Sequence, residues 1–172
     1  PLLMPTNRNP LPAALNRVPE IIFIYWVIKI ASTTLGETAA DMFSMTFEIG
    51  YGSTILIFLA LFGVALGLKL WIARYDPILY WVTFTATAIV GTAISDYIDR
   101  TLGLGYIVGS TILILLLLGT LFVWRKTEGS IAVEDIRTQR SEIFYWVAFL
   151  IANTLGTAAG DLLADDFGIG FL

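Results

Sequence analysis

Residues 25–41 read YWVIKIASTTLGETAAD, and the same pattern returns at residues 80–96 (YWVTFTATAIVGTAISD) and 145–161 (YWVAFLIANTLGTAAGD). Each copy begins with Tyr-Trp, has a glycine ten residues after the Trp, and ends with an aspartate five residues later. Three identical spacings indicate that the chain is an array of copies of one unit. The marker residues are Trp26, Gly36 and Asp41, then Trp81, Gly91 and Asp96, then Trp146, Gly156 and Asp161.

The composition indicates that this unit belongs to a membrane. Of the 172 residues, 57% are hydrophobic, which is above the usual share in a soluble domain. A helix needs about 20 mostly apolar residues to cross a bilayer. The sequence therefore predicts an all-α, polytopic transmembrane helix bundle with about five spans, at residues 21–40, 53–73, 78–96, 104–124 and 143–161.

Charged residues are divided unequally between the two sides of this predicted bundle. One side carries Arg8, Arg17, Arg74, Arg125, Lys126, Arg137 and Arg140. The other side has Arg100 as its only basic residue, beside Asp41, Glu48, Asp96, Asp99, Asp161, Asp165 and Asp166. By the positive-inside rule, we expect a multi-pass membrane protein with a cytoplasmic N-terminus. The five Trp residues (26, 71, 81, 124 and 146) then lie near the cytoplasmic interface, where we expect an aromatic belt.

The repeat unit is predicted to be two helices joined by a short acidic turn. Because each unit crosses the membrane twice, successive units run parallel. A Gly-x-Gly follows each repeated Asp, at 50–52, 103–105 and 168–170, and suits a tight reversal of the chain. The predicted segments are a polar N-terminal segment (1–19), repeat 1 (20–77), repeat 2 (78–124), a cytoplasmic connector with a short surface helix near 131–136 (125–141), and a partial repeat 3 with one helix (142–172).

These motifs resemble a known family. The Tyr-Trp starts, the segments 34–38 (TLGET) and 154–158 (TLGTA), and the connector from Glu128 to Trp146 are similar to bacterial polytopic membrane proteins built from tandem two-helix repeats with a characteristic Trp. The resemblance covers about residues 20–172. Such proteins usually have four repeats and eight spans, whereas this chain shows about two and a half repeats. The resemblance implies the fold and a location in the bacterial inner (cytoplasmic) membrane, and it implies no assigned function.

The chain has no Cys and no His, which excludes several kinds of site. Disulfides, thiol catalysis, histidine general bases and histidine-ligated haem or zinc are ruled out. We expect no cofactor, and any metal ion would need oxygen ligands. No nucleophile–base pair is visible, so we expect that the protein is not an enzyme. The expected partner is the lipid bilayer, with other membrane subunits or a second copy left open and no nucleic acid expected.

The candidate functional residues lie on a stripe in the first predicted span. Lys29, Thr33, Glu37 and Asp41 follow one another at steps of four, which places them along one side of a helix. A charge in hydrocarbon costs at least about 2.5 kcal/mol, so it needs a partner or a purpose. The later repeats have Phe84 and Phe149 in place of Lys29, and Thr92 and Thr157 in place of Glu37. The predicted transport or cation-binding residues are Lys29, Thr33, Glu37, Asp41, Asp96 and Asp161.

Structural roles compete with this interpretation. Lys29 can reach the cytoplasmic interface through its long side chain. The glycines at 36, 91 and 156 can allow close helix packing, as small residues do in membranes. The repeated aspartates can accept hydrogen bonds from the Gly-x-Gly amides instead of binding a cation.

Two function classes remain from these residues. The first is a transporter or exporter of a small cation or solute, in which Glu37 and Asp41 bind a hard cation or a proton. The proton is an alternative to the metal ion because a carboxyl group in apolar surroundings can hold one. The second class is a non-catalytic accessory or assembly subunit of a larger membrane complex.

Overall fold

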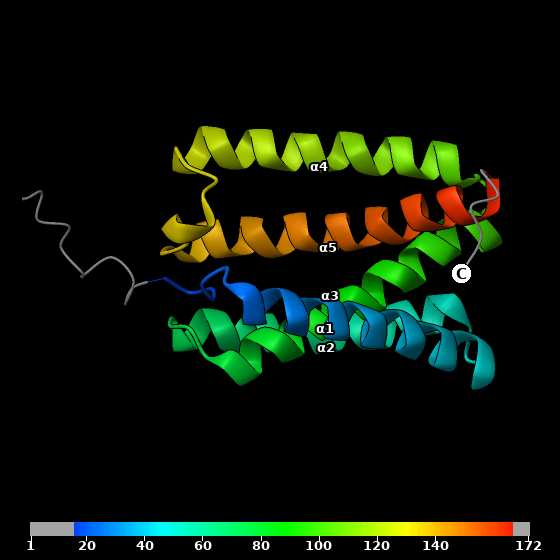
Figure 1. Ribbon diagram of the computed structural model, residues 1–172, viewed down its shortest axis with the longest axis horizontal. Coiled ribbons are helices and arrows are strands. Elements are labelled where there is room, and N and C mark those ends of the chain that lie inside the picture. The colour runs from blue at the N-terminus through cyan, green and yellow to red at the C-terminus, as the bar shows by residue number, and fades with distance from the viewer. Residues whose placement is uncertain (1–15, 167–172) are drawn as a thin grey trace, which may run out of the picture.

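The computed structural model describes residues 16–166 as a bundle of long helices (Figure 1). Arg8 and the third Gly-x-Gly, at residues 168–170, lie outside the described residues. The long helices are α1 (Phe23–Asp41), α2 (Gly50–Ile72), α3 (Pro77–Asp96), α4 (Tyr106–Glu128) and α5 (Gln139–Asp161). Short helical turns follow or separate them: η2 (Met42–Thr46), η3 (Tyr97–Thr101), η4 (Val133–Asp135) and η5 (Leu162–Asp166). The all-helical prediction is confirmed, and the short helix expected in the connector is η4.

Four helices, α2 to α5, are long and apolar enough to cross a membrane, which indicates a membrane protein. The prediction of five such spans needs a correction at α1, which is a helix but is not among these four in the described part of the chain. Its mean hydropathy is lowered by Lys29 and Glu37 together with its Ser and Thr residues. A helix of this kind needs other helices around its polar side.

Side-chain caps define the start of two helices. Asp76 caps α3 by accepting a hydrogen bond from the Leu79 backbone N–H at 2.8 Å, and Pro77 occupies the first helical position. At α5, Thr138 and Ser141 form a reciprocal capping box. These local signals stop the chain from forming one continuous helix through the connecting segments.

The repeat is visible in the backbone at the end of each first helix. Asp41, Asp96 and Asp161 are each the last residue of an α-helix, and each is followed by a five-residue π-helical turn. The turn after η3 uses Gly103 and Gly105, whose φ angles of 64° and 75° favour glycine. The predicted chain reversal after the repeated Asp is therefore confirmed in the described repeats. We call this end of the bundle the aspartate end and the opposite end the tryptophan end.

Helix α3 is the centre of the bundle and packs against α1, α2 and α5. Helix α4 packs on α5, and Figure 1 shows it at the outer edge of the molecule. Within the described residues, the two helices of one repeat make few contacts with each other. The second helix of each repeat packs on the first helix of the next one. The fold is therefore held by contacts between repeats.

The repeated glycines mark where first helices approach each other. A Cβ atom at Gly36 would overlap the side chain of Ala88 and lie 3.1 Å from the Ala88 carbonyl carbon. A Cβ at Gly91 would lie 2.9 Å from the Thr154 backbone nitrogen and 3.0 Å from the Asn153 Cβ. The close-packing role is therefore confirmed for these two glycines. At Gly156, the described part of the chain leaves open space, with no atom within 4 Å of such a Cβ.

The tryptophans do not form the uniform belt that the sequence suggested. Trp26 and Trp71 are exposed, with 49% and 82% of their surface accessible. Trp146 is fully buried and Trp124 is nearly so. The Trp146 ring packs against Phe62 of α2 and Tyr80 of α3, and against Tyr145 and Phe149 of its own helix. It is a core residue because the start of α5 lies inside the bundle.

Candidate functional site

A polar pocket of about 370 Å³ lies at the aspartate end, where the first helices of all three repeats meet. It contains all three repeated aspartates and Glu37, which lies one turn before the end of α1. Its lining comprises Glu37 and Asp41 from α1, Thr92 and Asp96 from α3, Gly156, Thr157, Gly160 and Asp161 from α5, and Arg100 from η3. Four carboxylates thus share the pocket with one guanidinium group, which makes it acidic.

Asp96 is the most deeply placed of these carboxylates. Only 3% of its surface is accessible. It forms an ion pair with Arg100, one turn later, with 3.7 Å between Oδ1 and Nε. Arg100 Nη1 also donates to the Tyr51 hydroxyl at 3.4 Å, which connects the pocket to α2. Asp96 is therefore buried and paired with a cationic side chain. The Glu37 and Asp41 side chains, in contrast, are exposed in the single chain.

Polar contacts between α3 and α5 support the pocket. The Oγ1 atoms of Thr92 and Thr157 lie 3.1 Å apart. One turn deeper, Asn153 Nδ2 donates to Thr87 Oγ1 at 3.1 Å. Both contacts link side chains on facing helices, so they fix the distance between the two walls.

Below the pocket, equivalent residues of the repeats meet layer by layer. The Phe84 and Phe149 rings have centroids 5.2 Å apart, and Lys29 Nζ lies 5.5 Å from the centre of the Phe149 ring. Deeper still, the hydroxyl oxygens of Tyr80 and Tyr145 are 2.6 Å apart. Tyr25, the equivalent tyrosine of the first repeat, is buried in the same cluster. The same face of each first helix is therefore directed to one common axis, with aspartates at one end and tyrosines at the other.

The predicted site residues separate into two groups. Glu37, Asp41, Asp96 and Asp161 are brought together around the pocket. Lys29 and Thr33 do not line it. Lys29 Nζ points toward the tryptophan end, 4.9 Å from the centre of the Trp26 ring. Thr33 donates to the backbone oxygens of its own helix, at 2.8 Å to Lys29 and 3.0 Å to Ile30.

The geometry also bears on metal binding. Among the side chains that the structure describes, which end at residue 164, no three acidic groups are close enough together to hold a metal ion. The pocket instead offers separated carboxylates and the Thr92–Thr157 hydroxyl pair. Such a set of groups suits a proton, a hydrated cation or a small organic cation better than a directly coordinated metal.

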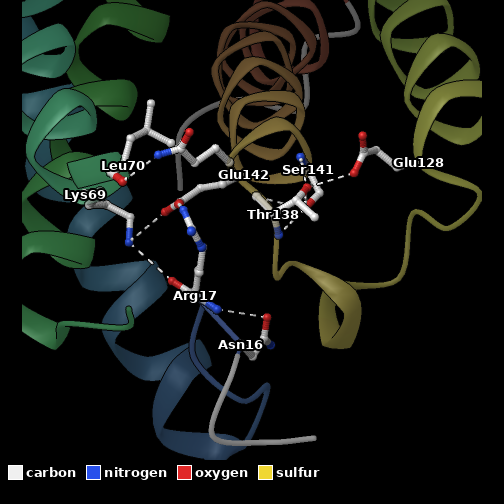
Figure 2. Close-up of polar contacts among 9 residues, drawn as sticks. Asn16, Arg17, Lys69, Leu70, Glu128, Thr138, Ser141 and Glu142 are labelled. Carbon is white, nitrogen blue, oxygen red and sulfur yellow. Dashed lines mark hydrogen bonds and ion pairs between the residues drawn. The ribbon is translucent and has the colours of Figure 1, made fainter. Parts of the chain in front are cut away.

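A second polar cluster lies at the tryptophan end and was not predicted from the sequence. Glu142, fully buried in the first turn of α5, accepts from Arg17 Nη1 at 2.9 Å and forms an ion pair with Lys69 Nζ at 3.1 Å (Figure 2). Lys69 Nζ also donates to the Arg17 backbone oxygen at 3.3 Å. We call these three residues the buried triad. Its signal in the sequence was Lys69, a cation within the very apolar α2.

The buried triad joins segments that are far apart in the chain. Arg17 precedes α1, Lys69 is in the last turn of α2, and Glu142 starts α5. An acidic residue in a first turn and a basic residue in a last turn both interact favourably with the helix dipole. Lys69 Nζ also lies 5.5 Å from the Tyr80 ring centre and 5.8 Å from that of Trp146. The triad therefore ties the tryptophan end of the bundle together directly below the tyrosine layer.

The N-terminal segment is fixed to the connector beside this triad. The Arg17 backbone N–H donates to the Ile136 oxygen at 2.9 Å, and Asn16 Nδ2 donates to the Val133 oxygen at 3.0 Å. Gln139 Nε2 donates to the Leu70 oxygen at 3.1 Å, which attaches the start of α5 to the end of α2. The polar segments before α1 and after α4 are therefore parts of one closed end.

The repeated geometry has a counterpart among known sequence families. The family described as Repeat of Unknown Function (DUF347) matches residues 24–75, 79–130 and 144–172. The chain belongs to this family. The match confirms the resemblance to a tandem-repeat family without an assigned function. No similar sequence was found among curated proteins, and no similar fold was found among solved structures.

Proposed function

We propose that this protein is a membrane transporter for a proton or a small organic cation, with the acidic pocket as its binding site. The observation that carries this proposal is the convergence of Glu37, Asp41, Asp96 and Asp161 on one pocket of about 370 Å³. Ionisable residues at membrane depth are costly, and they commonly mark the path of an ion or a substrate. Four carboxylates against the single Arg100 favour a cationic occupant.

The size and chemistry of the pocket narrow the class of cation. Its volume is in the range of sites for small molecules. The Thr92–Thr157 hydroxyl pair adds neutral hydrogen-bonding groups next to Glu37. A primary ammonium or guanidinium ion can use both kinds of group, since it donates several hydrogen bonds at once. We further propose an inner-membrane location with the tryptophan end in the cytoplasm, based on the positions of the basic residues, and no catalytic activity.

Transport by the purified chain in liposomes tests this proposal. Proton flux is followed with an enclosed pH-sensitive dye, and cation uptake with radiolabelled methylammonium or guanidinium. We expect Glu37→Gln and Asp96→Asn to abolish most of the flux. Glu48→Gln and Asp99→Asn are the matched controls because these residues lie at the same end of the bundle but do not line the pocket. Flux that survives the pocket substitutions, or no flux of any of these cations, contradicts the proposal.

The alternative is an accessory subunit of a larger membrane complex. It is favoured by the exposure of Glu37, Asp41 and Gly156, which leaves one side of the pocket uncovered in the single chain. Purification from native membranes in mild detergent tests it. A foreign protein present in equal amount would support the subunit role, and a preparation that contains this chain alone would oppose it.

A further inference from the structure

Two buried carboxylates in the described part of the chain are each paired with an arginine, and the two ion pairs differ in geometry. Arg17 Nη1 lies 2.9 Å from Glu142 Oε2, which is the length of a direct charge-assisted hydrogen bond. Arg100 Nε lies 3.7 Å from Asp96 Oδ1, which is too long for a hydrogen bond. Only 3% of the Asp96 surface is accessible. The acidic pocket therefore holds a buried carboxylate whose cationic partner is close but is not hydrogen-bonded through this pair of atoms.

The Arg100 side chain reaches to both sides of the pocket wall. Its Nε faces Asp96, which lines the pocket. Its Nη1 donates to the Tyr51 hydroxyl at 3.4 Å and lies 4.0 Å from Met45 Sδ. Neither Tyr51 nor Met45 lines the pocket. A rotation of the Arg100 side chain toward Tyr51 can therefore free Asp96 while the guanidinium group keeps a hydrogen-bond partner.

This cation belongs to the second repeat alone. The residue four positions after the repeated aspartate is Met45 in the first repeat, Arg100 in the second and Asp165 in the third. The same helical turn forms after Asp41 without a cation, so Arg100 is an addition to the shared scaffold. The group that it adds is planar and donates several hydrogen bonds in a fixed arrangement that matches a carboxylate. The pocket therefore already contains one guanidinium group next to its most deeply buried carboxylate.

We propose that the substrate of this pocket is a guanidinium compound, and that it takes the place of Arg100 at Asp96. The inference rests on the proposed transport function and names its substrate class. Arg100 is then a specificity-determining residue that competes with the substrate for one carboxylate. Such competition lowers the apparent affinity by the fraction of time for which Asp96 is available. After release, Arg100 returns to Asp96, so the buried charge is paired both with and without substrate.

Calorimetric titration of the purified full chain in detergent with millimolar guanidinium chloride tests this competition. If Arg100 occupies Asp96 for about nine-tenths of the time, Arg100→Gln should lower the apparent Kd about tenfold. Arg100→Lys keeps a tethered cation and should retain a Kd near that of the native chain. Arg74→Gln is the matched control, because it removes an exposed arginine at the tryptophan end, and it should leave the Kd unchanged. In liposomes, Arg100→Gln should lower both the KM and the maximal rate of guanidinium uptake, since a more tightly held substrate leaves more slowly.

A double variant separates displacement at Asp96 from other roles of Arg100. In an Asp96→Asn background, Arg100→Gln should give no further gain in affinity, because the carboxylate for which both cations compete is gone. A gain that persists there would show a general effect of charge and would overturn the proposal. An unchanged Kd with a lower melting midpoint would also overturn it, since Arg100 would then only brace the structure. Arg100→Met, which also removes the charge, repeats the test if Arg100→Gln purifies poorly.

The choice of cation tests the substrate class. Methylammonium should bind the native chain more weakly than guanidinium, and equal or tighter binding would overturn the guanidinium class. Binding and flux of methylammonium or protons, with no effect of Arg100→Gln on guanidinium, would refute this inference and leave the proposed function standing. A native chain that binds and transports none of these cations contradicts the proposed function, and this inference with it.

Discussion

Thr92 and Thr157 hold the same position in consecutive repeats, and their Oγ1 atoms lie 3.1 Å apart across the α3–α5 interface. The equivalent position in the first repeat is Glu37, which lines the same pocket as both threonines. A hydroxyl pair that joins two repeats therefore lies in one pocket with a carboxylate from the third. The repeats therefore share the packing residues and the aspartate at the helix end, and the first repeat adds a further carboxylate, that of Glu37.

We expect Glu142→Gln to destabilise the protein strongly. The substitution removes the only carboxylate of the buried triad and leaves Arg17 and Lys69 near each other without it. Breaking a buried ion pair typically costs about 3–5 kcal/mol. A thermal melt of the purified protein in one fixed detergent should show a large fall in midpoint. The exposed Glu134→Gln is the control and should melt like the native chain, and a similar midpoint for both variants would contradict the role of the triad.

The lysines of α1 and α2 should differ in how much they contribute to stability. Lys69 is 1% exposed and forms an ion pair with Glu142. Lys29 is half-buried, and its Nζ lies near the aromatic rings of Trp26 and Phe149. A cation–π contact contributes about 0.5–2 kcal/mol, less than a buried ion pair whose loss exposes an unpaired charge. Lys69→Met should therefore lower the melting midpoint more than Lys29→Met. Equal losses would show that the ion pair with Glu142 adds nothing to stability.

The glycine contacts should be sensitive to a single added methyl group. Gly91→Ala places a Cβ 2.9 Å from the Thr154 nitrogen, which is backbone and cannot rotate away. Overpacking of this kind costs about 1–3 kcal/mol. Gly119→Ala, where no described atom lies within 4 Å, should be close to neutral. The comparison is made by chemical denaturation of both variants in mixed micelles, and equal stability would refute close packing at Gly91.

The tyrosine layer should behave as a coupled pair. Tyr80→Phe removes one hydroxyl of the 2.6 Å contact and leaves that of Tyr145 buried with one fewer partner. Leaving a buried polar group unsatisfied costs about 1–3 kcal/mol. The double variant Tyr80→Phe/Tyr145→Phe should cost less than the sum of the two single variants, because it removes both hydroxyls. A double-mutant cycle on unfolding free energies measures the coupling, and strict additivity would mean that the hydroxyls do not interact.

Much of the fold could be predicted from sequence because its signals are local. The Trp–Gly–Asp spacing identified the repeats, and apolar windows located all five helices to within a few residues. The Asp followed by Gly-x-Gly correctly predicted the chain reversals after Asp41 and Asp96. The prediction that α1 is a fifth apolar span was wrong, because Lys29 and Glu37 make this helix more polar than the other four. The sequence pattern also assigned Trp146 to an aromatic belt at the cytoplasmic interface, although the side chain is fully buried in the bundle.

The candidate site was predictable only in part. Steps of four placed Lys29 and Glu37 on one side of α1, but they could not show that the Lys29 head turns toward Trp26, away from the pocket. Glu142 and Lys69 are 73 residues apart in the chain, and no sequence pattern connects them. Their pairing depends on how α2 and α5 meet at the tryptophan end.

The sequence by itself determined the helices, the repeat and the depth of each repeated residue, because these follow from periodicity along one chain. Only the tertiary structure decided which faces meet. It brought Asp41, Asp96 and Asp161 to one pocket, paired Glu142 with Lys69, and left Gly156 open. The physical reason is that packing between helices depends on the shapes of two surfaces at once, and a spacing pattern describes only one of them.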